Sequence, residues 1–259
     1  MTYKDILVST EGAIATLALN SPKTINALSK RMIAEMTDAL LKLSNDEAVK
    51  VVIIKANGKH FCAGHNLSEM VDSGVKEYKF IFDQCTNMMK LIHEIPQPVI
   101  AQVQGIATAA GCQLAAWCDL VVASEDARFS TPGVKIGLFC STPMVAISRA
   151  IGRKMAMEML LTGREFPAQE AKELGLVNKV VPLEELNATT EELAKKICAA
   201  SRFALSVGKQ GFYAQIDQID DKALHYAKQT IVMNNLSEDA QNGIKAFLEK
   251  RPSVNWKDR

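Results

Sequence analysis

The stretch VQGIATAAGCQLAAWCDLVVAS, residues 103–124, joins two apolar runs through a turn of small residues and a predicted helix that begins near Ala110. The second run, DLVVAS at 119–124, is typical of a strand buried on both faces, and such strands alternating with helices indicate an α/β protein with a parallel sheet. The turn leaves backbone N–H groups unpaired at the helix start, where the helix dipole favours negative charge. Gly105 and Gly111 fit neither the dinucleotide-binding nor the P-loop pattern, so no phosphate site of those kinds is expected.

A second unit of strand, turn and helix precedes this one. The buried strand VVIIKA, residues 51–56, is followed by HFCAGHNLSEM at 60–70, in which Ala63 and Gly64 precede a predicted helix. Two such turns could aim two backbone N–H groups at one point, which is the arrangement of an oxyanion hole. The alternative is that the small residues only allow a helix to pack closely against a strand.

The rest of the chain divides into a strand-rich part and a helical part. A β-hairpin is predicted at 5–9 and 13–20, and Ser29 is the predicted N-cap of the helix that follows. The predicted helices toward the C-terminus span 184–200, 203–215, 222–235 and 238–250. We therefore expect a core at 1–200 and a helical region at 201–259, whose apolar residues must be buried on the core or on other subunits.

Composition excludes several classes of function. The 259 residues are 48% hydrophobic and 23% charged, and the net charge of +1 favours neither nucleic acid nor an anionic membrane. No apolar run approaches the roughly 20 residues that span a bilayer. The six cysteines form no CxxC pair and no zinc-site pattern, so no metal is expected and a reducing compartment is favoured. The start MTYKDILVST lacks a signal pattern, which favours the cytoplasm; the mitochondrial matrix is the alternative if a transit peptide precedes this sequence.

Five segments together resemble the crotonase, or enoyl-CoA hydratase/isomerase, superfamily. They are SPKTINALS (21–29), AGHNLSEM (63–70), QGIATAAGCQLAAWCDLVVAS (104–124), TGREFPAQEAKELGLVNKVVP (162–182) and GIKAFLEKR (243–251). The resemblance covers nearly the whole chain. It implies a ClpP-like spiral core of ββα repeats, a helical C-terminal trimerisation region, and a homotrimer or dimer of trimers. It also implies acyl-CoA thioester substrates of fatty-acid or acyl-CoA metabolism, with coenzyme A as part of the substrate and no separate cofactor.

The resemblance also implies roles for individual residues. The N–H groups of His65 and Ala110 would polarise the thioester carbonyl. The coenzyme A pocket would include Lys23, Ala27, Leu28, Ala63 and Gly64, and two tail residues, Phe247 and Lys250, would reach the coenzyme A of a neighbouring subunit. Without the resemblance, Lys23 and Lys250 would be interpreted as solvated surface residues.

The sequence departs from the superfamily at the two acids of its hydratases. Adding water across a double bond needs a base and an acid, which those enzymes supply as two glutamates. The matching positions hold Gln113 and Gly133, and neither residue can exchange a proton near neutral pH. Each proton-transfer group contributes about 10²–10⁴-fold, so hydratase activity of the two-glutamate kind is not expected.

Several functions therefore stay open. An enzyme could use the same oxyanion hole for decarboxylation or thioester hydrolysis, and a Gly-His sequence like that at His65 occurs in the methylmalonyl-CoA decarboxylase branch. A non-catalytic coenzyme A ester-binding protein is the alternative of another class. The segments TAAGCQL, TPGV and GLFCSTP indicate a distinct subgroup in which both acids are absent. Asp119, at the start of a buried strand, is interpreted as a structural cap or pairing group.

Overall fold

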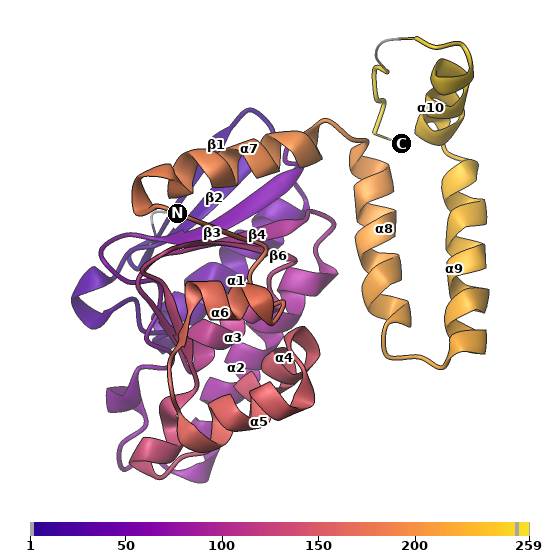
Figure 1. Cartoon of the computed structure of the whole chain (residues 1–259). Coiled ribbons are helices and arrows are strands. Elements are labelled where there is room, and N and C mark those ends of the chain that lie inside the picture. Colours follow the sequence, from indigo (N-terminus) through magenta and orange to yellow (C-terminus); the bar gives the residue numbers. More distant parts are fainter. Residues whose placement is uncertain (1–2, 252–253, 259) are drawn as a thin grey trace.

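The fold is built around a six-stranded sheet, seen in a computed structural model that describes residues 3–251 and 254–258 (Figure 1). Its strands lie in the order β1-β2-β3-β4-β6-β9. Their bounds are β1 Ile6–Glu11, β2 Ile14–Leu19, β3 Val51–Ala56, β4 Val99–Val103, β6 Leu120–Ser124 and β9 Lys179–Val181. The pair β1 and β2 is antiparallel, as the predicted hairpin requires, and all other pairs are parallel.

A second, three-stranded sheet was not predicted. It consists of β5 Ile106–Thr108, β7 Arg128–Ser130 and β8 Phe166–Pro167. A bridge between Cys62 and Ala107 adds the segment after β3 to the same sheet. The three units that begin with β3, β4 and β6 therefore each place one strand in the large sheet and a short extended segment in the small one before the next helix, which is the ββα pattern that the resemblance implies.

The helices cover both faces of the large sheet. The main core packs the sheet against α1 Lys30–Ser44, α2 Val75–Glu94 and α3 Ala110–Trp117, and a smaller core lies under α7 Leu186–Cys198 (Figure 1). The remaining helices of the core are α4 Pro143–Ala150, α5 Arg153–Thr162 and α6 Ala168–Glu173, with short 3-10 turns η1 Pro22–Thr24, η2 Leu67–Glu69, η3 Pro132–Ile136 and η4 Leu183–Glu185. Ser29 caps α1 as predicted, because its hydroxyl accepts a hydrogen bond from the Met32 N–H at 3.1 Å.

The last three helices extend beside the core rather than over the sheet (Figure 1). They are α8 Arg202–Gln215, α9 Asp220–Asn235 and α10 Glu238–Leu248. The buried Lys209 of α8 binds the core, whereas α9 has no buried residue within the part of the chain that the structure describes. The helical region predicted at 201–259 thus begins with α8. Residues 1–2 of the predicted core and residues 252–253 and 259 of the predicted helical region lie outside the described residues.

Candidate functional site

The two turns that the sequence singles out pack directly against each other. The Thr108 N–H donates to the Cys62 carbonyl at 2.9 Å, which joins the segments that lead into both turns. A methyl group on Gly64 would lie 2.8 Å from the Ala109 Cβ and 3.1 Å from the Ala110 nitrogen, and Gly64 has a φ of +90°. A methyl group on Gly111 would overlap the Cys62 carbonyl oxygen. Glycine is therefore required at both positions by the close approach of the two backbones.

Each turn presents one unpaired N–H group. Within residues 3–251 and 254–258, the backbone N–H groups of His65 and Ala110 have no hydrogen-bond acceptor, although their neighbours are held in place. Leu28 donates to the Gly64 carbonyl at 2.7 Å, and Ala109 donates to the Ser130 carbonyl at 2.9 Å. Ala109 adopts φ +50° and ψ −120°, which an alanine rarely does and which turns the start of α3 toward the first turn. The two free donors thus lie on rigid, adjacent backbone.

A groove of about 500 Å³ lies beside the first turn, where Asn66, the residue after His65, forms part of its wall. Lys23, Ala27 and Asn66 are among the residues that line it, and Leu28 connects it to the first turn through the bond to Gly64. Lys4 and Lys23 bring positive charge to the groove and Glu69 brings a negative charge. Arg31 also lines it, but it is paired with the buried Asp5, which accepts two hydrogen bonds from it at 2.8 Å each. The structure therefore brings Lys23, Ala27, Leu28 and Gly64 together, with Ala63 next to them in the chain.

The two predicted tail residues lie elsewhere in the same chain. Phe247 is exposed at the end of α10, and Lys250 follows with a φ of +54°. In Figure 1, α10 lies beyond α8 and α9, away from the sheet, and neither Phe247 nor Lys250 is among the residues that line the groove. One chain alone does not bring Phe247 and Lys250 to the groove, so their predicted role requires a neighbouring subunit.

The positions of the missing acids differ in their surroundings. Gln113 is buried on the first turn of α3, and its Oε1 has no hydrogen-bond partner among the described residues. A methyl group on Gly133 would lie 2.8 Å from the Leu138 carbonyl oxygen and 2.9 Å from the Cys140 Sγ. The site is thus polar but uncharged at position 113, and closed to any side chain at position 133.

The His65 imidazole packs against α2 and is neutral. Its ring meets the Phe82 ring edge to face, with 5.2 Å between centroids, and burial lowers the His65 pKa to about 4. Its Nε2 has no partner in the described part of the chain. Burial also raises the pKa values of Cys62 and Cys112 to about 12, so both thiols are protonated at neutral pH and neither is a nucleophile.

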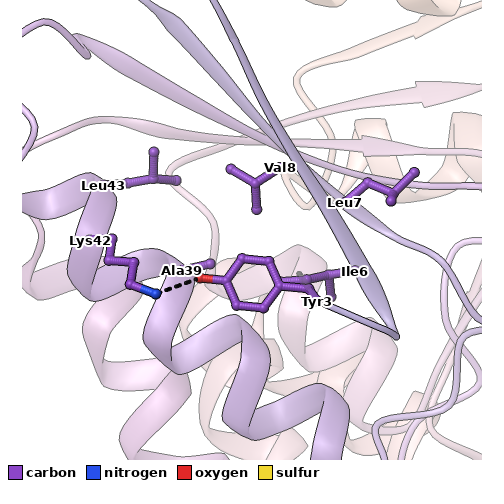
Figure 2. Close-up of a pocket in the computed structure, with 7 residues that line it drawn as sticks. All are labelled: Tyr3, Ile6, Leu7, Val8, Ala39, Lys42 and Leu43. Carbon is purple, nitrogen blue, oxygen red and sulfur yellow. Dashed lines mark hydrogen bonds between the residues drawn. The ribbon is translucent and has the colours of Figure 1, made fainter. Parts of the chain in front are cut away.

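A second hollow, between β1 and α1, offers no comparable chemistry. Its lining includes Leu7, Val8 and Tyr3, and the Lys42 Nζ donates to the Tyr3 hydroxyl at 3.3 Å (Figure 2). It lies on the outer edge of the sheet, away from both turns. No cluster of three metal-binding side chains occurs in residues 3–251 and 254–258, and no helix described there is long and apolar enough to cross a membrane.

One buried polar residue near the turns, Thr131, is not predicted from the sequence. Thr131 follows Ser130, whose carbonyl holds Ala109, and its hydroxyl has no hydrogen-bond partner among the described residues. The sequence signal that could have pointed to Thr131 is its position before Pro132, in the segment that carries Gly133.

Comparisons with known sequences and structures show which proteins this chain resembles. The enoyl-CoA hydratase/isomerase family model matches residues 9–259. The mitochondrial enoyl-CoA hydratase domain-containing protein 3 of Mus musculus is 45% identical over 94% of this chain and 82% of its own length. The crystal structure of the human protein of that name is 43% identical, has a TM-score of 0.95, and covers 97% of this chain and 100% of the other. An enoyl-CoA hydratase structure from Mycobacterium smegmatis is 47% identical, with a TM-score of 0.95 over 97% and 98% of the two chains. The crotonase fold and the predicted membership of this superfamily are thereby confirmed.

Proposed function

The chain belongs to the enoyl-CoA hydratase/isomerase family, and we propose that it binds acyl-CoA thioesters and polarises their carbonyl group between the N–H groups of His65 and Ala110. The proposal depends on one observation: the two N–H donors have no acceptor, and they lie on two turns that pack in close contact at Gly64 and Ala109. Loss of one donor from an oxyanion hole costs about 2.7–4 kcal/mol of transition-state stabilisation, so the pair suffices to support a reaction.

The polarised carbonyl has several chemical uses. Withdrawing electron density from it acidifies the neighbouring carbon, stabilises the enolate left by decarboxylation, and favours attack on the thioester carbon. Hydration by two carboxylates is not among these uses here, because Gln113 and Gly133 occupy both positions. The protein is hydratase-like in its binding of the substrate and distinct in the groups that could transfer a proton.

A non-catalytic acyl-CoA-binding protein is the second candidate. The protonated thiols and the absence of an acid at positions 113 and 133 favour it, and the His65 imidazole is only a weak base because burial lowers its pKa to about 4. The two candidates share the same binding geometry and differ only in turnover.

The proposal includes the assembly and the compartment. Exposed apolar side chains on α9 and α10 support a homo-oligomer, a trimer or a dimer of trimers, in which Phe247 and Lys250 reach the groove of a neighbour. Mitochondrial relatives and six unpaired cysteines support a reducing compartment, either the cytoplasm or the mitochondrial matrix.

One experiment tests the function and separates its candidates. The purified protein is titrated calorimetrically with butyryl-, crotonyl- and methylmalonyl-CoA, and each mixture is then analysed for products by mass spectrometry. Binding with turnover of any member supports the enzyme, and binding without turnover supports the non-catalytic protein. A failure of every thioester to bind contradicts the proposed function, and rapid hydration of crotonyl-CoA contradicts the argument from Gln113 and Gly133.

A further inference from the structure

A further groove, the outer groove, lies on the face of the large sheet that α7 covers, opposite to α1, α2 and α3 (Figure 1). Its volume is about 430 Å³, within the range of about 300–1,000 Å³ that is typical of small-molecule sites. Its lining comes from four strands, β1 to β4, and from α7, and apart from two isoleucines all of the lining side chains are polar or charged. It shares no lining residue with the groove beside the first oxyanion turn.

One side chain of the outer groove is a buried amide without a partner. Gln102 on β4 is 9% exposed, and its side chain forms no hydrogen bond with the described residues. Its amide is nevertheless open to the groove, unlike the amide oxygens of Gln97 and Gln104, which are completely shielded from solvent. Buried polar groups of native proteins normally have partners, so this amide calls for a ligand in the groove.

A lysine lies beside this amide. Ile54 of β3 pairs with Ala101 of β4, so the next residues of the two strands, Lys55 and Gln102, are neighbours on the other face of the sheet. The Lys55 Nζ donates to the Asn187 Oδ1 at 3.4 Å, and no carboxylate within residues 3–251 and 254–258 forms an ion pair with it. The ammonium has three N–H donors and the amide has two, which is a donor set suited to an oxyanion.

The two acidic side chains of the outer groove do not compete for this lysine. Glu191 pairs with Lys195 on α7 at 3.7 Å. The pairing of β1, β2 and β3 places Glu11 level with Val51, which lies four residues before Lys55 and therefore about 13 Å from it along the strand. The Lys55 end of the groove thus carries a positive charge that the protein itself leaves unpaired.

We propose that the outer groove is a second ligand site, in which the Lys55 ammonium and the Gln102 amide bind the carboxylate or phosphate group of a small polar molecule. An oxyanion accepts protons from both side chains and neutralises the lysine, which neither a cation nor an apolar ligand would do. The site is independent of the proposed function, because thioester binding uses neither of these residues.

The test uses the Gln102 side-chain amide as a local reporter. The full-length ¹⁵N-labelled protein is titrated with sodium acetate and, separately, with sodium phosphate at constant ionic strength, and the amide signal is assigned by its loss in Gln102→Leu. Each anion that fits the site should shift this signal saturably, with a dissociation constant on the order of 1 mM. The anion that binds more tightly indicates whether the natural ligand carries a carboxylate or a phosphate.

Variants of the lysine make the result specific. Lys55→Met should weaken binding at least about 10-fold, because it removes a charged hydrogen bond, and Lys55→Arg should restore most of it. Lys196→Met is the matched control, since Lys196 lies on α7 outside the groove and pairs with Glu192; it should leave the dissociation constant unchanged.

The Asn187 side-chain amide serves as the reporter in Gln102→Leu, where binding should weaken about 2- to 10-fold through the loss of a neutral hydrogen bond. If neither anion shifts the Gln102 signal saturably, the amide is satisfied by water alone and the inference is overturned. A dissociation constant that survives Lys55→Met overturns it as well. Neither result affects the proposed function, which the thioester titration tests separately.

Discussion

At the scale of single residues, the candidate site depends on backbone that few side chains tolerate. Ala109 holds a φ of +50°, a conformation that costs about 1–3 kcal/mol and persists only where the surrounding structure imposes it. The surrounding structure here is the contact with Gly64 and the bond from Ala109 to Ser130. Such strain gathers at functional sites, which supports a role for the neighbouring N–H of Ala110.

The close packing at Gly133 predicts that hydratase activity cannot be restored by adding the acids. A side chain there would meet the Leu138 carbonyl and the Cys140 Sγ, and overpacking of this kind costs about 1–3 kcal/mol. We expect Gln113→Glu combined with Gly133→Glu to be less stable and to show no gain in crotonyl-CoA hydration, followed by loss of the enoyl absorbance. Gln113→Glu alone is the control for folding. A hydration rate that rises in the double variant would contradict this account of position 133.

The buried His65 predicts a loss of stability in mild acid. Its pKa is lowered to about 4, so between pH 6.5 and 4 the unfolded chain takes up a proton that the folded chain does not. The stability is therefore fully present above about pH 6.5 and falls as the pH drops toward 4. Urea midpoints at pH 7.5 and 5.5 measure the fall, which should be smaller in His65→Leu. His93, whose pKa is also about 4, accounts for a further part. Equal falls in both proteins would show that His65 does not contribute.

At the scale of elements, one ion-pair network fastens α8 to the core. Lys209 donates to the carbonyls of Ile92 and Gln97 at 2.6 and 2.7 Å and pairs with Asp119 at 2.9 Å. Tyr213 donates to the other Asp119 oxygen at 2.7 Å, which confirms the interpretation of this aspartate as a pairing group. Asp119 lies just beyond the C-terminal end of α3, so the helix that begins at the oxyanion turn ends at the attachment of the tail.

Breaking this network should loosen the tail. Lys209→Met leaves the partly buried Asp119 carboxylate without its cation, and removal of one partner of a buried ion pair costs up to about 3–5 kcal/mol. Urea denaturation should show that loss. The control Lys222→Met changes an exposed lysine on α9 and should alter the free energy of unfolding by no more than about 0.5 kcal/mol. A similar small effect of Lys209→Met would mean that α8 is held by apolar packing alone.

Sequence patterns predicted some elements better than others. The strands at 51–56 and 99–103 and the helices of the tail were predicted because their apolar residues are continuous or periodic over many positions. The small sheet was missed because β5 and β7 are three residues long and β8 is two, too short to show a period. The two turns were found from their small residues. The closure of position 133 by Cys140 and the orphaned hydroxyl of Thr131 depend on tertiary contacts that no local pattern records.

At the scale of the whole molecule, the tail carries apolar surface that one chain leaves uncovered. Along α9, Leu224, Val232 and Met233 are 70%, 50% and 63% exposed, and Phe247 of α10 is 83% exposed. Soluble monomers rarely expose contiguous apolar patches larger than a few hundred Å². These side chains are therefore expected to be buried between subunits, which would also bring Phe247 and Lys250 toward a neighbouring groove.

Charge introduced on α9 should separate the subunits. Leu224→Glu with Met233→Glu is expected to shift the molar mass measured by light scattering from a trimer or hexamer toward the 28.3 kDa of one chain. Thioester binding should weaken in parallel if the tail completes a neighbour's site. Lys228→Glu, on the same helix and exposed, is the control and should keep the assembly. A wild-type protein that is already monomeric would contradict the proposed assembly.

The carbonyl stretching frequency of a bound thioester tests most directly whether the two turns form an oxyanion hole. Butyryl-CoA labelled with ¹³C at the thioester carbonyl is followed by infrared difference spectroscopy on binding. Two N–H donors at His65 and Ala110 that polarise the carbonyl should move its band below the position observed in water. A bound thioester whose carbonyl band stays at or above the aqueous position would show that the two turns do not form an oxyanion hole.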